Sequence, residues 1–290
     1  MGATEFGFNC LQKLLRMKEN IVAIYTLPKI FRISVSEKPL QITTHKDFRG
    51  VALKKNIPLI EVNRKMKDYT KSIESFKPDF ILVCGWYYMI PKIIRDIPIL
   101  GCACIHASLL PKYRGWAPLV WAIINGEKKT GVSFFYLAEK VDSGDIIAQK
   151  EISITKKDTI KTIYQKVTKA SLKILGKYIP LIEKGKVQRV RQNEDGATYF
   201  PMRSPEDGLI NWNKNTLEIY NWIRAQTKPY PGAFFFNKEG QKIKVWSAKL
   251  FSETKKILQK PGTILSQNKK EMKIATGNGY ITITNWEVER

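Results

Sequence analysis

Short apolar runs alternate with amphipathic segments over the first 154 residues, and this alternation is the feature that most constrains the fold. The expected strands cover residues 21–26, 57–61, 80–84, 102–105, 131–137 and 146–154. The intervening segments with apolar side chains at helical spacing are residues 46–55, 69–76, 91–96 and 116–125. Strands that alternate with helices predict an α/β fold with a doubly wound, mostly parallel, Rossmann-like sheet.

The first residues form a glycine-containing turn, Met1–Gly7, which leads into a helix that ends near Met17. In a βαβ unit such a turn follows a strand, and no strand precedes this one. We therefore expect the sheet to lack a strand of about five residues, as if the amino terminus were truncated. The alternative is that the turn is a frayed start of the chain.

The pattern changes in the last third of the sequence, where turns separate five short strand-like runs. These runs are residues 233–236, 242–250, 262–266, 272–276 and 280–286. Such a series predicts a small β-barrel of the OB type or a related open sheet. A long helix over residues 159–183 leads to it. We expect a first domain over residues 1–185, a linker over 186–202 and a second domain over 203–290.

The composition describes a soluble globular chain with excess positive charge. Hydrophobic residues make up 43% of the 290 residues, and the formal net charge is +23. The excess is spread along the chain, so it indicates either RNA binding or a general compositional bias with solvated lysines. No apolar run approaches the roughly 18 residues of a membrane span, and no signal peptide is visible. We expect a cytoplasmic location and no membrane partner.

Two common classes of site have no motif in this sequence. Cys10, Cys84, Cys102 and Cys104 lie in or beside apolar runs without zinc or redox spacing, so free buried thiols and no metal site are expected. The chain also has no GxGxxG or Walker loop. The expected sheet therefore hosts a ligand other than a dinucleotide or a nucleoside triphosphate.

His106 stands at the end of the strand expected at residues 102–105 and is one of only two histidines. In an open parallel sheet, ligands bind beyond the carboxyl ends of strands, so this position favours a functional side chain. Asp142 follows another strand, and we expect it to meet His106 at the same sheet edge. A carboxylate beside an imidazole fixes its tautomer, as a general base requires. A histidine that only stiffens a turn is the structural alternative.

Four linked segments around His106 form one long motif. They are HASLLPKYRGWAP from His106, AIINGE from Ala122, TGV from Thr130 and VDSGDI from Val141. Together with RSPEDGLINW from Arg203 and RAQTKPYPGAF from Arg224, they resemble the N10-formyltetrahydrofolate-dependent formyltransferase family. The resemblance covers nearly the whole chain. It implies a Rossmann-like catalytic formyltransferase domain followed by that family's smaller C-terminal domain.

The resemblance implies transfer of a formyl group from N10-formyltetrahydrofolate to a primary amine. His106 and Asp142 match the family's catalytic histidine and aspartate. His106 is expected to stabilise the tetrahedral intermediate and relay a proton, while Asp142 orients it or accepts the amine's proton. The resemblance also assigns Asp142 and one loop to the folate pocket. That loop comprises Gly85, Trp86, Tyr87, Tyr88, Met89 and Ile90, whose rings either stack on the cosubstrate or belong to the core.

Position 104 departs from the family pattern. The resemblance places a catalytic asparagine two residues before the histidine, and this chain has Cys104 there. An amide donates a strong hydrogen bond to a developing oxyanion, whereas a thiol is a weak donor. Losing one such donor costs roughly 100- to 1000-fold in rate. Either another donor substitutes, or the enzyme is slow or uses an altered acceptor, or formyl transfer is lost.

The acceptor in this family is either methionyl-tRNA or a nucleotide-linked amino sugar. The segment Pro28–Thr44 does not resemble the basic insertion of the tRNA enzymes, and the turn Lys228–Phe234 is closer to the sugar enzymes. We therefore favour a nucleotide-linked amino sugar, with Ser108, Arg114 and Gly115 as substrate-binding residues. The alternatives are methionyl-tRNA, which the positive charge favours, and a folate- or nucleotide-binding relative without catalysis. An oligomer is compatible with the sequence.

Overall fold

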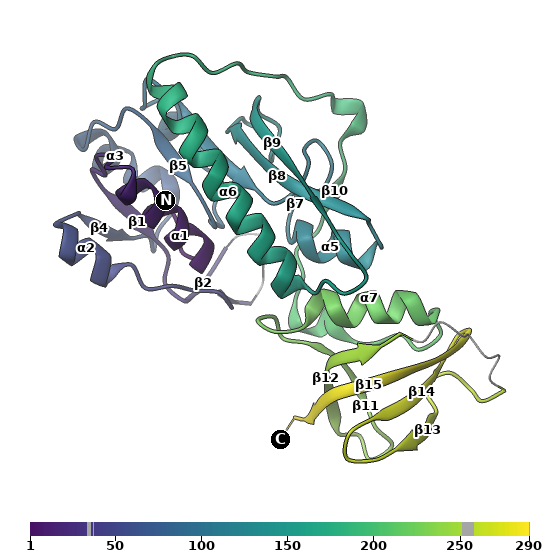
Figure 1. Cartoon of the computed structure of the whole chain (residues 1–290). Coiled ribbons are helices and arrows are strands. Elements are labelled where there is room, and N and C mark those ends of the chain that lie inside the picture. Colours follow the sequence, from purple (N-terminus) through teal and green to yellow (C-terminus); the bar gives the residue numbers. More distant parts are fainter. Residues whose placement is uncertain (34–35, 37, 251–257, 290) are drawn as a thin grey trace. The chain divides into compact units, whose positions relative to one another are not determined.

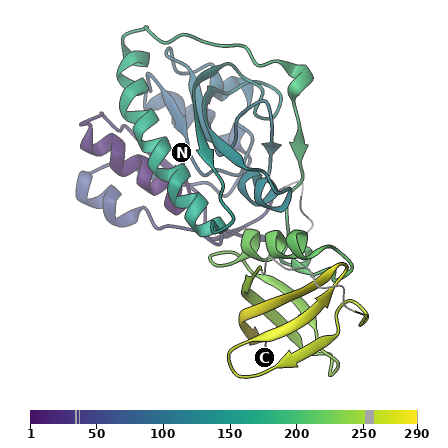
Figure 2. The same cartoon turned by 45° about the vertical axis from the view of Figure 1, so that its right-hand side comes forward.

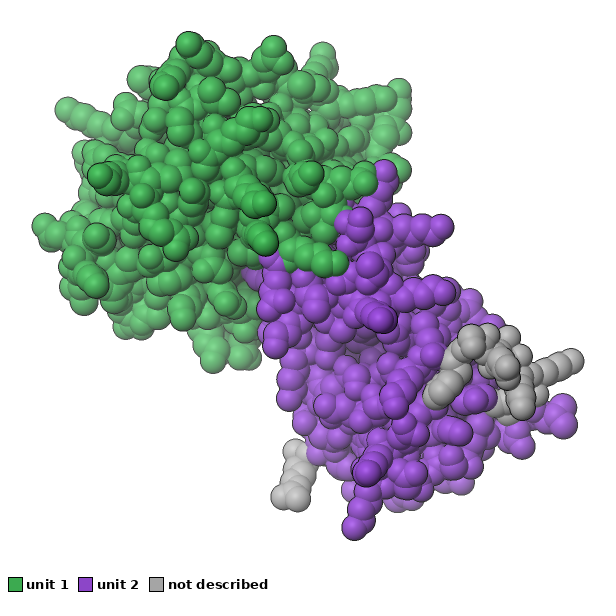
Figure 3. Space-filling model, viewed as in Figure 1, with its two compact units in different colours: residues 1–114, 131–152, 166–199 green, residues 115–130, 153–165, 200–290 purple. Residues whose placement is uncertain are grey.

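The chain packs as two compact units in the computed structural model, which describes residues 1–33, 36, 38–250 and 258–289 (Figure 1). Unit 1 contains residues 1–114, 131–152 and 166–199, and unit 2 contains residues 115–130, 153–165 and 200–290 (Figure 3). Both units are thus assembled from segments that are distant in sequence. The expected linear division at residues 185 and 203 stays a prediction.

Unit 1 is α/β, as predicted, but its strands form two separate sheets. In the first, β1 (Ile24–Thr26) pairs in parallel with β4 (Leu59–Glu61). The second has the order β5-β6-β8-β9. Its strands are β5 (Ile81–Val83), β6 (Cys102–His106), β8 (Lys129–Tyr136) and β9 (Ile146–Ser153). β5 and β6 are parallel, whereas β8 is antiparallel to β6, so this sheet is mixed.

Helices supply the apolar faces that cover these strands. They are α1 (Glu5–Arg16), α2 (Arg49–Lys55), α3 (Thr70–Ser75), α4 (Lys92–Arg95) and α6 (Ile160–Glu183), with the 3₁₀ helices η1 (Met66–Tyr69) and η2 (Glu194–Gly196). The Thr4 side chain caps α1 by accepting from the Gly7 N–H. Leu11 of α1 and Ala52 of α2 then pack with Ile24 in one core cluster. Two short strand pairs lie in loops: β2 (Ile30–Phe31) with β3 (Leu40–Gln41), and β7 (Arg114–Gly115) with β10 (Tyr199–Phe200).

Residues 1–3 lie between β1 and β5 and bond to both. Gly2 N donates to Tyr25 O at 3.0 Å, and Cys84 N donates to Met1 O at 2.9 Å. Next to this contact, a cavity of about 570 Å³ separates the two strands. Residues 1–3 thus connect the two sheets of unit 1 by backbone hydrogen bonds.

Unit 2 contains an antiparallel sheet with the order β11-β12-β15-β14-β13 (Figure 2). Its strands are β11 (Ala233–Phe236), β12 (Lys242–Lys249), β13 (Ile264–Gln267), β14 (Met272–Thr276) and β15 (Gly279–Val288). Ile219 and Ile223 of α7 (Thr216–Gln226) pack on Val245 and Ile281 of the sheet. Over the described strands, β11 and β13 are edges that do not pair with each other. The expected closed barrel is therefore wrong, and the open-sheet alternative is correct, because the one helix covers the apolar face that closure would have buried.

The rest of unit 2 consists of α5 (Pro118–Ile124), η3 (Pro205–Gly208) and residues 153–165. Arg224 of α7 donates to the carbonyl oxygens of Thr155 and Asp158, which joins residues 153–165 to the helix. In the described ranges of both units, no helix is at once long and apolar enough to cross a membrane. Three residues of the segment Pro28–Thr44 that bears on the acceptor, at positions 34, 35 and 37, lie outside the described residues.

Candidate active site

His106 is the last residue of β6, and two neighbours fix its largely buried ring. Nε2 lies 2.7 Å from the carbonyl oxygen of Tyr113, and Nδ1 lies 3.5 Å from Oδ2 of Asp142. A carbonyl oxygen only accepts hydrogen bonds, so Nε2 carries the proton in the first contact. In the neutral ring, Nδ1 then presents its lone pair toward the Asp142 carboxylate. The pair is therefore arranged to hold one proton between the two side chains.

Asp142 reaches His106 by a different path from the predicted one. Leu137 N donates to Cys102 O, so β8 ends beside the beginning of the antiparallel β6 rather than beside His106. Residues 137–145 then turn back, and Asp142 has a φ of +48°. The expected meeting of the two side chains is observed, but a loop brings them together and not a shared edge of parallel strands.

Gln192, which follows α6 in the chain, holds this loop in place. Gln192 is 5% exposed, and its Nε2 donates to the carbonyl oxygens of Asp142 at 2.8 Å and Gly144 at 2.7 Å. Its Oε1 accepts from Nη2 of Arg114 at 2.7 Å. One amide therefore connects the loop of Asp142 to the loop that follows His106. We name residues 192–199 the strap.

Arg114 is fully buried, and all three of its side-chain nitrogens donate to side chains of the strap. Besides Gln192, it bonds both carboxylate oxygens of Glu194, at 2.7 and 2.9 Å, and the hydroxyl of Tyr199. The hydrogen bonds from Arg114 lower the pKa of the Glu194 carboxyl below its ordinary value. Acceptors from the strap already occupy the guanidinium of Arg114. Contact of Arg114 with substrate stays a prediction.

The other residues predicted to bind substrate lie in the same loop. Ser108 is 1% exposed, and its Oγ donates to Lys112 O at 2.7 Å. Gly115 has a φ of +92°, and a Cβ there would lie 2.7 Å from Phe200 O. Tyr113, whose carbonyl oxygen holds His106, donates its own N–H to Thr198 Oγ1 of the strap at 2.8 Å. The described geometry thus gives Ser108 and Gly115 roles in shaping the loop, and their contact with substrate stays a prediction.

Cys104 shares a face of β6 with His106, because alternate residues of a strand point the same way. Its Sγ lies 3.6 Å from Ile105 O, the acceptor that the thiol can reach. Burial, followed by the nearby Cys84 thiol and the Asp142 carboxylate, raises the pKa of the Cys104 thiol well above its ordinary value. Cys104 therefore keeps its proton at neutral pH and is a weak donor beside the pair.

The loop predicted to hold the folate follows β5, next to His106. Val83 is opposite Cys104 in the parallel ladder, so residues 85–90 leave the sheet at the end where His106 lies. Gly85 has a φ of +63°, and a Cβ there would overlap the Thr4 side chain. The indole Nε1 of Trp86 is buried and lacks a hydrogen-bond partner among the described residues.

The remaining loop residues divide into packed and exposed ones. The Tyr87 and Tyr88 rings meet Phe31 edge to face, at centroid distances of 5.3 and 5.7 Å. Ile90 is buried, whereas Met89 is 54% exposed. Among the loop's rings, Trp86 carries the unsatisfied donor, so it is the ring best fitted to a polar heterocycle.

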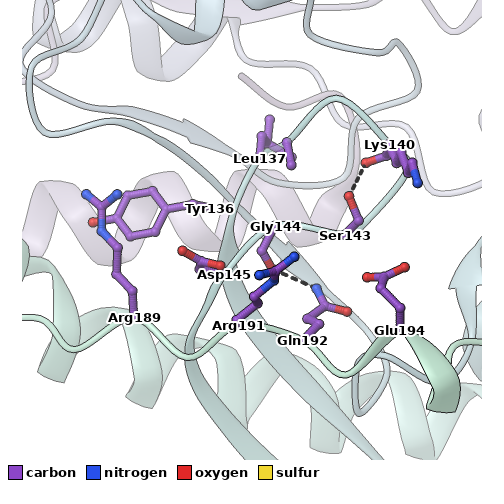
Figure 4. A pocket seen from close by; sticks show the side chains of 11 residues that line it. Tyr136, Leu137, Lys140, Ser143, Gly144, Asp145, Arg189, Arg191, Gln192 and Glu194 are labelled. Carbon is purple, nitrogen blue, oxygen red and sulfur yellow. Dashed lines mark hydrogen bonds between the residues drawn. The ribbon is translucent and has the colours of Figure 1, made fainter.

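A cavity of about 390 Å³ lies against the loop that carries Asp142 (Figure 4). Lys140 comes from this loop, while Arg189 and Arg191 come from the segment just before the strap. Figure 4 shows the Arg189 guanidinium over the ring of Tyr136, at 4.0 Å from its centroid. Asp145 and Glu194 also line the space, and Glu194 is paired with Arg114. The basic side chains make this cavity suited to an anionic group.

The strap is the part of the site that the sequence analysis missed. Residues 186–202 had the polar composition of a linker, and side chains that bond individual carbonyl oxygens leave no periodicity in a sequence. One signal was available. A buried arginine needs acceptors, so Arg114 within an apolar motif implied an acidic partner elsewhere in the chain.

The comparisons with known proteins agree on one family. The family model described as formyl transferase matches residues 20–179, and the model of the formyl transferase C-terminal domain matches residues 203–290. The methionyl-tRNA formyltransferase of Alkaliphilus oremlandii is 35% identical over 292 residues, which cover 98% of this chain and 89% of that protein. The chain therefore belongs to the formyl transferase family, and the resemblance inferred from its motifs is confirmed.

Two further relatives show the range of this family. The bifunctional polymyxin resistance protein ArnA of Wigglesworthia glossinidia brevipalpis is 40% identical over 270 residues, which cover 91% of this chain but only 39% of that protein. The crystal structure of an N-formyltransferase from Helicobacter canadensis superimposes with a TM-score of 0.69 at 19% identity, covering 99% of this chain and 97% of that one. The second likeness confirms the fold class.

Proposed function

We propose that this protein transfers a formyl group from N10-formyltetrahydrofolate to the primary amine of a nucleotide-linked amino sugar. The observation that carries the proposal is the His106–Asp142 pair, with Nδ1 at 3.5 Å from the carboxylate and Nε2 fixed on Tyr113 O. In the reaction the amine nitrogen bonds to the formyl carbon, and the bond from that carbon to N10 breaks. The products are an N-formyl amine and tetrahydrofolate.

The pair supplies the proton path that this exchange requires. The attacking amine gives up one proton, and the departing N10 gains one. Because Nε2 is held by the Tyr113 carbonyl, Nδ1 and the Asp142 carboxylate are the positions that take up the first proton and return the second. The strap keeps Asp142 within reach through the two bonds from Gln192, so the acceptor is in place before substrate arrives.

One independent observation supports binding of the folate cosubstrate by the loop of residues 85–90. Burying an indole N–H without a partner costs free energy, and the flat, heteroatom-rich ring of a folate offers an acceptor for Trp86 Nε1. Solved structures with this fold include one described as a sugar 3N-formyl transferase in the presence of dTDP and 5-N-formyl-THF. Trp86 is accordingly the residue that we assign to the pterin ring.

The acceptor is assigned from the charges beside the loop of Asp142. A nucleotide-linked sugar carries a diphosphate, and Lys140, Arg189 and Arg191 provide cations for it in the 390 Å³ cavity. The Helicobacter canadensis structure is described as a complex with folinic acid and dTDP-3-aminofucose, which supports this substrate class. Arg114 contributes to the site by bracing the strap.

Methionyl-tRNA is the second candidate, and a specific observation favours it. Several relatives named methionyl-tRNA formyltransferase align over 85 to 90% of their own length, and this chain has a net charge of +23. A tRNA acceptor would bring many phosphates, so its binding would weaken steeply with salt.

The deciding experiment incubates the protein with N10-formyltetrahydrofolate and a panel of amines, and detects formylated products by mass spectrometry. The panel contains dTDP- and UDP-linked amino sugars and charged initiator methionyl-tRNA. Formylation of a nucleotide sugar supports the proposal, and formylation of the tRNA alone transfers it to the second candidate. Folate binding without any product would overturn both and leave a binding protein.

The variant Cys104→Asn tests the weak donor in the site. If the thiol limits the reaction, the amide raises the turnover number by roughly 100-fold or more, because a strong oxyanion donor is restored. The matched control is Cys104→Ala, which removes the thiol without supplying a stronger donor. Equal rates for wild type and Cys104→Asn would show that another group already stabilises the oxyanion.

A further inference from the structure

Ser133 of β8 lies directly opposite His106 of β6 in the antiparallel ladder. Residues in such a pair send their side chains to the same face of the sheet, with Cβ atoms about 5 Å apart. Ser133 is fully buried. Its hydroxyl is therefore a buried polar group on the face of the sheet that carries the imidazole.

This hydroxyl spends its whole hydrogen-bonding capacity on holding the loop of residues 108–112, which follows His106. Ser133 Oγ accepts from Leu110 N at 3.0 Å and donates to Ser108 O at 2.7 Å. It also accepts from Nε2 of Gln149, on the neighbouring strand β9, at 2.8 Å. A hydroxyl has one donor and two acceptor positions, so all three are occupied.

Gln149 ties the same loop to β9. Its Nε2 donates to Leu110 O at 2.8 Å, in addition to Ser133 Oγ. Both backbone polar groups of Leu110 are thus bonded to side chains of the sheet. Leu110 is 3% exposed, so breaking either bond would leave a buried polar group without water to replace its partner.

The packing of Leu109 holds the loop in the same place. A Cβ on Gly131 of β8 would overlap the Leu109 side chain and lie 2.6 Å from Lys150 O. Leu109 therefore lies directly against the strand backbone, where the absence of a side chain leaves room for it. Polar and apolar contacts together fix the loop on β8 and β9.

The position of the loop sets the position of the Tyr113 carbonyl. Ser108 Oγ donates to Lys112 O at 2.7 Å, and Lys112 N donates to Leu109 O at 3.1 Å, which closes the loop on itself. Tyr113 is the next residue, and its carbonyl oxygen lies 2.7 Å from Nε2 of His106. Ser133 and Gln149 thus act on the imidazole through one backbone oxygen.

The two neighbours of the His106 ring favour different tautomers. The Tyr113 carbonyl, which only accepts, favours a proton on Nε2, whereas the Asp142 carboxylate, 3.5 Å from Nδ1, favours a proton on Nδ1. A neutral ring has only one N–H. The shorter contact to Tyr113 selects Nε2–H, and displacement of this oxygen would leave the carboxylate to select Nδ1–H.

We propose that Ser133 and Gln149 are positioning residues for His106. By fixing residues 108–112 they keep the Tyr113 carbonyl on Nε2, and so they hold the neutral ring in the tautomer whose Nδ1 can take up a proton. Their effect on rate rests on the proposed formyl transfer. Their effect on the tautomer does not.

The tautomer can be measured directly, because the chain has only two histidines, His45 and His106. Protein labelled with ¹⁵N-histidine gives two imidazole patterns in long-range ¹H–¹⁵N spectra at alkaline pH. We expect Nε2–H for His106 in wild type and a shift to mainly Nδ1–H in Ser133→Ala and in Gln149→Met. His45, whose Nε2 lies 3.1 Å from Leu27 O, is the internal reference and should not change.

Steady-state kinetics test the consequence for the reaction. In both variants kcat should fall roughly 10- to 100-fold, because the proton acceptor is misplaced, while KM stays within about twofold. Ser133→Thr keeps the hydroxyl and should restore both the tautomer and kcat. The double variant should lose no more than the weaker of the two single variants, since both side chains hold the same loop.

Ser171→Ala is the matched control for the loss of a buried serine. Ser171 of α6 is fully buried and donates to Val167 O within its own helix. Its removal should change neither the tautomer of His106 nor kcat. Gln149 is exposed, so Gln149→Met is expected to fold even if Ser133→Ala does not.

Retention of the Nε2–H tautomer in Gln149→Met and in folded Ser133→Ala would overturn the proposal. A shifted tautomer with wild-type kcat would also overturn it, since the side chains would then hold the ring without effect on the reaction. If wild-type protein formylates no amine, the proposed function fails, and the tautomers of the variants alone decide whether Ser133 and Gln149 position His106.

Discussion

The surroundings of His106 and the edges of the β1–β5 cavity lie in the same unit but differ in how their backbone is bonded. Around His106, side chains from distant segments bond the loop carbonyls and amides, namely Gln192 to Asp142 and Gly144, and Thr198 to Tyr113. Along the cavity, the described strand edges are held mainly by pairing with neighbouring strands, β1 with β4 and β5 with β6. The loops around His106 therefore depend on individual side chains for their position, whereas the cavity edges depend on strand pairing.

The largest expected effect comes from removing the carboxylate of Asp142, the proposed proton acceptor. Asp142→Asn should lower the turnover number by roughly 100- to 10,000-fold, because an amide cannot take up the amine's proton. The melting temperature should change little, since the loop is held through its backbone and not through this side chain. Steady-state kinetics and thermal denaturation measure both.

The matched control for this variant is Asp96→Asn, which removes a carboxylate paired with Lys92 on the surface. Its activity should equal that of wild type. Wild-type activity in Asp142→Asn itself would contradict the proposal that the His106–Asp142 pair takes part in the reaction.

The second effect tests whether bracing matters for chemistry. Gln192→Met keeps the length of the side chain but loses both donors to the Asp142 loop, so we expect a loss of roughly 10- to 100-fold in kcat with little change in KM. Hydrogen exchange at residues 142–145 should accelerate. Gln192→Glu keeps the acceptor for Arg114 but not the donors, and should resemble Gln192→Met in kcat.

The exposed Gln188 lies in the same connecting segment and provides the control, since Gln188→Met should leave kcat unchanged. If Gln192→Met lowered stability but not kcat, the strap would be a structural support without influence on the reaction.

The third effect concerns how tightly the loop of residues 137–145 packs against β8. A Cβ at Gly144 would overlap the carbonyl oxygen of Tyr136, so Gly144→Ala should destabilise the protein by about 1 to 3 kcal/mol. Chemical denaturation measures the change. Gly50 in α2 has open space around it, and Gly50→Ala should instead stabilise by up to about 1 kcal/mol. Equal effects of the two variants would contradict the claim that the loop is tightly packed.

The smallest expected effect concerns the pH dependence of stability and involves Glu19, which lines the cavity between β1 and β5 together with Glu183. The pKa of Glu19 is raised from 4.5 to about 7, so between these values the folded chain binds more protons than the unfolded chain. The contribution of Glu19 to stability should therefore fall as the pH rises from 4.5 to 7 and level off above. Glu19→Gln should flatten this part of the profile, whereas the exposed Glu74→Gln should not. Denaturation midpoints across the range give the answer.

The local hydrophobic pattern of the sequence predicted most helices and strands. What it missed depends on how strands pair with one another. The strands Ala233–Phe236 and Met272–Thr276 and the helix Ile160–Glu183 lie where periodicity indicated. The short pairs β2–β3 and β7–β10 were not predicted, since two-residue strands have no period. The antiparallel direction of β8 was also missed, because strand direction depends on how the chain returns and not on the composition of the strand.

The candidate site could be proposed from sequence to the extent that its residues stand in one motif. His106, Asp142 and Cys104 were named from local sequence and a family resemblance; the contact between His106 and Asp142 is observed, and their catalytic roles stay predictions. Gln192 could not be named in this way, because its role depends on the carbonyl oxygens of residues about 50 positions away. Side chains that are candidates for a reaction are easier to identify in a sequence than side chains that hold a backbone in place.

The strap has a consequence for the order in which the protein is made. His106 and Asp142 leave the ribosome well before Gln192, Glu194 and Thr198, which hold their loops. A nascent chain that has emerged only as far as Glu183 contains both His106 and Asp142 but lacks the hydrogen bonds that hold their loops. The site is therefore completed late in synthesis, after the whole of α6 has emerged.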